Sequence, residues 1–138
     1  MHPRIHTAVV LALVVLGGAG VSDAQNELTR EDRQGRVTVT VTLSAPPVDL
    51  TPVRVQVALD THSVMLDAIG FEDAVAMRSP EGIDIRPSAV VEVKGSGHHR
   101  EAVLVFPPIA QGGALRIVVK NVGGVPERLF IWGCPTVC

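Results

Sequence analysis

The chain has 138 residues, of which 46% are hydrophobic and only 3% aromatic, and it carries a formal net charge of −2. This length fits a single domain, and the scarcity of aromatic residues means that its core has to be mainly aliphatic. The nearly balanced, slightly acidic charge argues against nucleic acid or an acidic membrane surface as a partner.

The N-terminal segment has the pattern of a secretory signal peptide. Arg4 supplies the positive charge, 8–16 is an apolar run, and 17–24 contains the small residues of a cleavage region. Glycines interrupt the apolar run well before the roughly 20 residues that a membrane span needs. We therefore expect residues 1–24 to be cleaved off after Ala24, which leaves a periplasmic or secreted protein with no membrane insertion. No cysteine at the cut offers a lipoprotein anchor.

Alternation of β-branched and polar residues dominates the rest of the chain. A charged, polar stretch over 25–35 predicts a flexible lead-in, and the clearest strand follows it over 36–44, where valines alternate with threonines. Further strands are expected at 53–59, 73–78, 89–94, 102–106, 115–120 and 128–132.

The connections between these strands complete the predicted fold. A short helical turn is expected over 63–70, the wholly apolar 102–106 predicts a central strand covered on both faces, and glycines at 123 and 124 predict a closing hairpin. Residues 36–133 are therefore expected to form an all-β domain. The predicted architecture is an immunoglobulin-like or cupredoxin-like antiparallel β-sandwich of about seven short strands, with a partly open barrel as the alternative.

Two cysteines, Cys134 and Cys138, lie in a short tail over 134–138. Export to an oxidising compartment favours a disulfide between them, although so small a loop adds little to global stability. The stretch is also similar to the Cys-Pro-x-x-Cys of the copper-delivery proteins that assemble cytochrome oxidase, and two thiolates could bind Cu(I). Those proteins have flanking helices that this chain lacks, so the disulfide is the favoured prediction.

The first candidate site follows the second predicted strand. If its phase continues, Asp60 and His62 project from the same face, where they could bind a metal or orient the imidazole. The alternative is a strand-end turn in which Asp60 and Ser63 bond to nearby backbone. The string also invites comparison with the Asp-Thr-Gly-Ser of aspartic proteases, but His62 replaces the glycine and the chain has no second copy.

The second candidate site is the glycine-rich loop that carries His98 and His99. Imidazoles suit copper, zinc or nickel, so these two residues, with His62 and Asp60, are the predicted metal ligands. The alternative is a pair of solvated surface histidines without a ligand.

Three segments carry a resemblance to a group of small exported bacterial proteins. They are the Thr-His-Ser-Val of 61–64, the Gly-His-His-Arg of 97–100, and the Gly-Gly-Val-Pro-Glu-Arg of 123–128 that precedes Phe130 and Trp132. The resemblance spans most of the predicted domain and implies one secreted β domain with polar loops. It implies no established activity, and the cysteine tail lies beyond the group's pattern.

Charged residues beside the glycine-rich loops have a structural interpretation. They are expected to hold the loops in register through ion pairs, each of which contributes about 0–1 kcal/mol when exposed. The residues concerned are Arg100, Glu127 and Arg128, and the expected partners of the charges include Asp60, Asp67 and Glu101.

The sequence thus predicts an exported, non-catalytic β-sandwich module with a structural role or a protein-interaction role. Its expected partner is another exported protein. No nucleophile, base and oxyanion-binding group can be assembled from the sequence, so no enzyme is predicted. The alternative function is a periplasmic protein that binds copper or zinc through His62, His98, His99 and Asp60.

Overall fold

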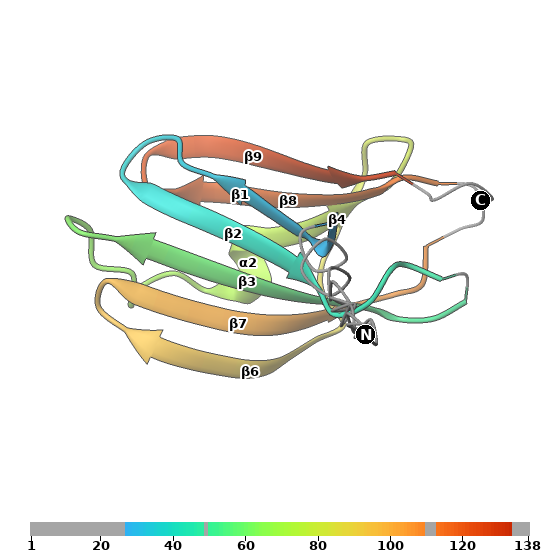
Figure 1. Cartoon of the computed structure of the whole chain (residues 1–138), viewed down its shortest axis with the longest axis horizontal. Helices are drawn as coiled ribbons and strands as arrows, with labels where there is room; N and C mark the ends of the chain where they lie inside the picture. Colours follow the sequence, from blue (N-terminus) through green and yellow to red (C-terminus); the bar gives the residue numbers. More distant parts are fainter. Residues whose placement is uncertain (1–26, 49, 110–112, 134–138) are drawn as a thin grey trace, which may run out of the picture.

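The chain folds as an all-β sandwich of two antiparallel sheets (Figure 1). The computed structural model describes residues 27–48, 50–109 and 113–133, so the predicted signal peptide and the Cys134–Cys138 disulfide lie outside the described residues. One sheet has five strands in the order β1-β2-β3-β7-β6, and the other has four in the order β5-β4-β8-β9. The elements are β1 (Thr29–Asp32), β2 (Val37–Leu43), β3 (Val53–Thr61), α2 (Phe71–Ala74), β4 (Val75–Arg78), β5 (Asp84–Ile85), β6 (Ala89–Ser96), β7 (His99–Phe106), β8 (Leu115–Val122) and β9 (Val125–Trp132).

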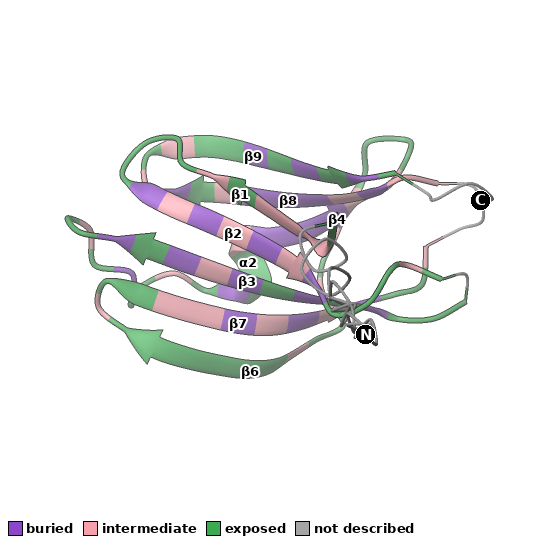
Figure 2. Ribbon diagram, viewed as in Figure 1, coloured by how far each residue is buried: buried purple, intermediate pink, exposed green. Residues whose placement is uncertain are grey.

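Side-chain alternation explains why these residues form strands. In β2 and β3 every second residue is buried, and the threonines of β2 alternate with valines that point into the core (Figure 2). The core is mostly aliphatic, as predicted, and each fully buried valine or leucine contributes roughly 1.5–3 kcal/mol of transfer free energy. The aromatic side chains buried in it are Phe71, Phe106, Phe130 and Trp132.

The structure corrects the lead-in predicted over 25–35, because β1 lies inside it and pairs with β2. Its sequence, Thr-Arg-Glu-Asp, has no apolar alternation and so gave no strand signal. Contacts made by distant residues hold it instead. The Trp132 indole donates to the Leu28 carbonyl at 3.2 Å, and Arg128 donates to Asp32 at 2.9 Å.

Three local predictions also need correction. Residues 63–70 are irregular, and the short helix α2 begins directly after Gly70 rather than ending there. The strand expected over 73–78 begins only at Val75, and the two-residue β5 was not predicted. In β7, burial alternates because only one face of this apolar strand meets the core.

The described residues contain no helix of the length and apolar character that a membrane crossing requires.

Candidate functional site

The structure brings the two predicted histidine segments together at one end of the sandwich. Asp60 of β3 lies directly opposite His99 of β7 in the register of the five-stranded sheet. Just beyond the paired strands, the Thr61 amide donates to the His98 carbonyl at 3.0 Å. We call loop 62–70, together with the β6–β7 turn formed by Gly97 and His98, the histidine end.

Hydrogen bonds to backbone groups join loop 62–70 of the histidine end to the β6–β7 turn. The Leu66 amide donates to the Gly97 carbonyl at 2.8 Å, and the Gly97 amide donates to the Asp67 carboxylate at 3.0 and 3.2 Å. The turn requires glycine, since Gly97 has φ +66° and a side chain on Gly95 would collide with the His99 carbonyl oxygen. Both glycines therefore have a structural reason to precede the histidines.

Arg100 fixes the other side of the same loop. Its Nη1 donates to the carbonyl oxygens of Leu66, Asp67 and Ile69 at 2.9, 3.3 and 2.7 Å, and its guanidinium lies 5.2 Å from the centroid of the Phe71 ring. The sequence predicted a structural role with carboxylate partners. The role is confirmed but the partners were wrong, because the loop presents three carbonyl oxygens to the two N–H groups of Nη1.

The strand-end turn expected at Asp60 is built by Thr61 instead. The Thr61 hydroxyl donates to the Arg36 carbonyl at 2.6 Å and accepts from the Ser63 amide at 3.2 Å. This leaves the Asp60 carboxylate on the outer face of the sheet.

Asp60 pairs with His99 rather than with His62. Its Oδ1 lies 2.5 Å from Nδ1 of His99, and the two side chains are 51% and 55% exposed. The hydrogen bond and the charge of Asp60 raise the pKa of His99. The other ring nitrogen, Nε2, lies 4.0 Å from Glu101, which also accepts a hydrogen bond from Gln56.

The side chains of the histidine end do not converge on one point. Among the described residues, no three histidine, cysteine, aspartate or glutamate side chains are grouped so that they could hold a metal ion. His62 lines an open hollow of about 170 Å³ with Asp60, Arg36 and Thr38, on the side of Asp60 that faces β2. The structure thus brings the predicted ligands onto neighbouring strand ends without forming a coordination sphere.

The sheet also aligns a serine, a histidine and an aspartate across three strands. Ser96 of β6 lies opposite His99, which lies opposite Asp60. This row is on an exposed sheet surface, and the free nitrogen of His99 approaches Glu101. Acyl transfer needs the histidine to activate the serine beside a group that stabilises an oxyanion. The observed contacts of His99 do not supply that arrangement.

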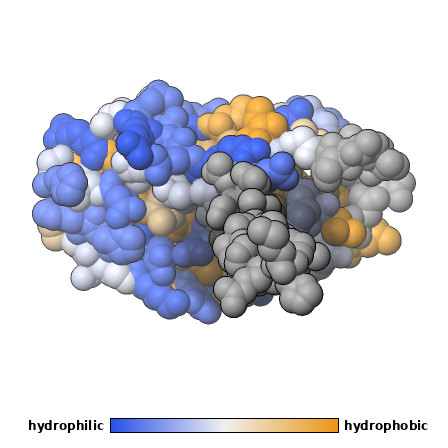
Figure 3. Space-filling model, viewed as in Figure 1, coloured by the Kyte–Doolittle hydropathy of each residue, from blue (hydrophilic) through white to orange (hydrophobic). Residues whose placement is uncertain are grey.

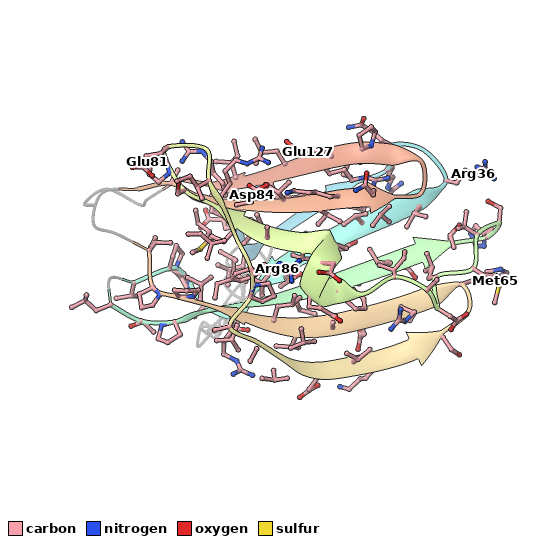
Figure 4. The ribbon with its side chains drawn as sticks, turned by 180° about the vertical axis from the view of Figure 1, so that it is seen from behind. Arg36, Met65, Glu81, Asp84, Arg86 and Glu127 are labelled. Carbon is pink, nitrogen blue, oxygen red and sulfur yellow. The ribbon has the colours of Figure 1, made fainter. Side chains whose placement is uncertain are left out.

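Met65 is a surface residue that sequence reasoning missed. It is 64% exposed, and its methyl group lies 3.9 Å from the position that a side chain on Gly97 would occupy. Figure 4 shows Met65 projecting at the same end of the molecule as Arg36. It lies in an apolar triplet of which only Leu66 is fully buried, so the sequence gave no signal that Met65 faces outward.

Two more charged residues have partners that the sequence did not predict. Arg128 is buried and donates to Asp32 and to the carbonyls of Gln34, Val37 and Val122. Glu127 accepts two hydrogen bonds from Arg78 at 2.6 and 2.8 Å, on the outer surface of the four-stranded sheet. The expected carboxylate partners were therefore wrong for Arg128, and Glu127 joins β9 to β4 instead of holding a glycine-rich loop.

The fold and the histidine end together define the class of this protein. It is a β-sandwich domain in which a loop and a turn at one end are joined by hydrogen bonds. No family model, curated protein or solved structure matches the chain.

Proposed function

We propose that this chain is an exported, non-catalytic interaction module that binds another exported protein through its histidine end. The signal-like pattern of residues 1–24 supports export. The observation that carries the binding role is the lock between loop 62–70 and the β6–β7 turn, in which Asp67 and Arg100 bond to backbone groups of these two segments.

This lock has a physical consequence for recognition. Binding costs conformational entropy when surface loops become ordered, and a loop that is already fixed avoids much of that cost. The fixed loop carries an exposed methionine, a residue type that adapts to apolar pockets, next to exposed His62 and His98. The fitting partner therefore offers an apolar pocket for Met65, bordered by hydrogen-bond acceptors or acidic groups for the imidazoles.

The test compares two surface substitutions at opposite ends of the sandwich. Immobilised protein is used to capture a partner from envelope proteins, and the purified partner is then titrated against each variant by calorimetry. We expect Met65→Glu to weaken binding at least tenfold. Leu50→Glu, at an exposed position of the opposite end, is the matched control. Equal affinity of the two variants would contradict the proposed surface.

A second candidate function, copper binding, is favoured by one observation. The bond from Thr61 to the His98 carbonyl brings His62 and His98 onto adjacent strand ends, and the Met65 thioether lies at the same turn. Imidazole and thioether are both copper ligands.

Copper titration separates the two functions. Copper affinity weaker than about 10 μM, on the scale where 1 μM corresponds to −8.2 kcal/mol, would rule out a dedicated site. The same conclusion follows if copper affinity is unchanged in His98→Ala/His99→Ala. Partner binding that survives a chelator supports the interaction module alone.

A further inference from the structure

The strand β6 forms a free edge of the five-stranded sheet. In the part of the chain that the structure describes, β7 is its only hydrogen-bonded neighbour strand. The other side of β6 is uncovered in both Figure 1 and Figure 4. The opposite edge differs, because β1 is tied to β9 by the Arg128–Asp32 pair and by the Trp132 indole. A free edge presents unpaired backbone groups that a further strand can satisfy.

Two apolar side chains of β6 are exposed. Val91 and Val93 are 45% and 52% exposed. A register irregularity falls between Val90 and Glu92, so pairing with β7 is continuous from Glu92 to Ser96. The regular half of the edge is therefore the part that a second strand can extend.

The charges on β6 are arranged symmetrically about Val93. Glu92 and Lys94 flank it, and their side chains form an ion pair at 2.9 Å on the outer face of the sheet. When a strand pairs antiparallel with its own copy about one residue, the residue before that centre faces the residue after it. Centred on Val93, each Glu92 faces Lys94 of the second copy, and the two Val93 side chains face each other.

We propose that two copies of this chain pair through β6, antiparallel and centred on Val93, to form a dimer with one continuous sheet. Opposite charges that face each other across strands stabilise the pairing, and like charges destabilise it. The sequence Glu-Val-Lys satisfies this condition twice in a twofold dimer.

A lysine on a sheet edge often protects against pairing because a second strand would bury its charge unpaired. Here Glu92 already balances Lys94, and in the dimer the four side chains alternate in sign. The charge pattern of this edge therefore favours pairing with its own copy over pairing with a strand that lacks complementary charges.

The dimer is independent of the proposed function and has a consequence for it. Because the paired strands are antiparallel, the two histidine ends point in opposite directions along the shared sheet. Each dimer would then present two histidine ends, and each end could bind one partner molecule.

The first experiment uses charge reversal and sedimentation equilibrium of the purified protein over a wide concentration range. Pairing of one strand lies at the small end of stable interfaces, so we expect a dimer that dissociates in the micromolar range. Glu92→Lys alone and Lys94→Glu alone each place like charges opposite each other, and each should weaken dimerisation at least tenfold. A mixture of the two variants should restore it, since every facing pair is again opposite in sign.

Cross-linking provides a second test that does not depend on charge. In a Cys134→Ser/Cys138→Ser background, Val93→Cys should form an intermolecular disulfide rapidly on oxidation. Leu129→Cys on β9 has similar exposure, at 46% for the native residue, and should not.

The outcomes are decisive together. A wild-type protein that stays monomeric at every concentration overturns the dimer, as does equal cross-linking at positions 93 and 129. A monomer that captures a different protein through the same edge, with capture lost in Lys94→Glu, also overturns self-pairing and assigns the edge to another strand.

Discussion

The two ends of the sandwich are held together in different ways. At the histidine end the connections bond to one another, as when loop 62–70 bonds to the β6–β7 turn. At the opposite end two connections close on themselves through hydrogen bonds from Thr51 to Val48, from Gly82 to Ser79 and from Ser79 to Ile83, and a third bonds from Ser88 to the adjacent strand β7 at Val105. Bonds between loops fix their relative positions, whereas bonds within a loop fix only its own shape. The residues with candidate chemistry thus lie on the end that is cross-connected.

Arginines mark the same contrast. Arg100 bonds to backbone carbonyls of loop 62–70 in the histidine end, and Arg128 bonds to the Gln34 carbonyl in the β1–β2 connection. Arg78, near the opposite end, pairs with the carboxylates of Asp84 and Glu127 on the outer surface of the four-stranded sheet, where Figure 4 labels both acids.

That end also contains an open, mainly apolar hollow of about 360 Å³ beside Met77 and Leu115. Figure 3 shows a separate apolar patch over β9.

The largest effect is expected from Arg128→Met. Its side chain is fully buried, and its loss would leave the carbonyls of Gln34, Val37 and Val122 without the arginine donor and Asp32 with only its hydrogen bonds from Gln34. Removing one partner of a fully buried ion pair typically costs about 3–5 kcal/mol of unfolding free energy. Because the Asp32 side chain is 21% exposed, we expect a loss near the lower end of this range. Urea denaturation would measure the loss, with the 78% exposed Arg33→Met as the control. Equal unfolding free energies of the two variants would show that the buried bonds of Arg128 do not stabilise the fold.

The same variant should change the acid sensitivity of the protein. Burial alone would raise the pKa of Asp32, but hydrogen bonds from Gln34 and Arg128 outweigh it and lower the pKa. A lowered folded pKa gives stability that is present above the ordinary value of about 3.9 and is lost as pH falls through the folded value. Part of that loss should disappear in Arg128→Met, so its unfolding free energy should fall less steeply between neutral and acidic pH.

A smaller effect is expected from Arg100→Met. It removes three charge-assisted hydrogen bonds to loop 62–70, and we expect a loss of about 2 kcal/mol. The diagnostic measurement is amide hydrogen exchange at Leu66 and Gly97, which should accelerate more than exchange in β2. Uniform acceleration across both sheets would mean that Arg100 stabilises the whole fold and not this end.

The next effect concerns the His99–Asp60 pair. Because the pKa of His99 is raised, its contribution to stability is present below the ordinary value of about 6.5 and is lost as pH rises through the folded value. Both side chains are half exposed, so the contribution should stay under about 1 kcal/mol. NMR titration of the ring should show a lower pKa in Asp60→Asn. An unchanged titration midpoint would mean that the pair does not form in solution.

The smallest effect is expected from Leu50→Ser. Leu50 is 85% exposed in a connection of the opposite end, so stability should change by less than about 0.5 kcal/mol. Thermal unfolding would measure it. A loss as large as that of Arg100→Met would show that the opposite end is as strongly coupled to the core as the histidine end.

The sequence predicted most of the strands because their pattern is local. In β2 and β3 alternate valines identify the buried face directly. The same reasoning predicted the β8–β9 hairpin, because the glycines of its turn punctuate two apolar runs. It failed for β1, whose polar residues are ordered by Arg128 from the far end of the chain.

The candidate site shows the same division. The residue types and the clustering of His98 and His99 were visible in the sequence, and the two segments do meet at one end. The partner of each side chain was not visible. Asp60 faces His99 because β3 and β7 are neighbours in that register, although the two residues are 39 positions apart.

By itself, the sequence determined which residues can enter a strand and which face of that strand seeks the core, because hydrophobic burial follows a period of two. Only the tertiary structure decided which strands are neighbours, which loops share an end and which edge stays free. These depend on contacts between residues distant in the chain, such as the hydrogen bond from the buried Arg128 to Asp32. No local pattern encodes that choice.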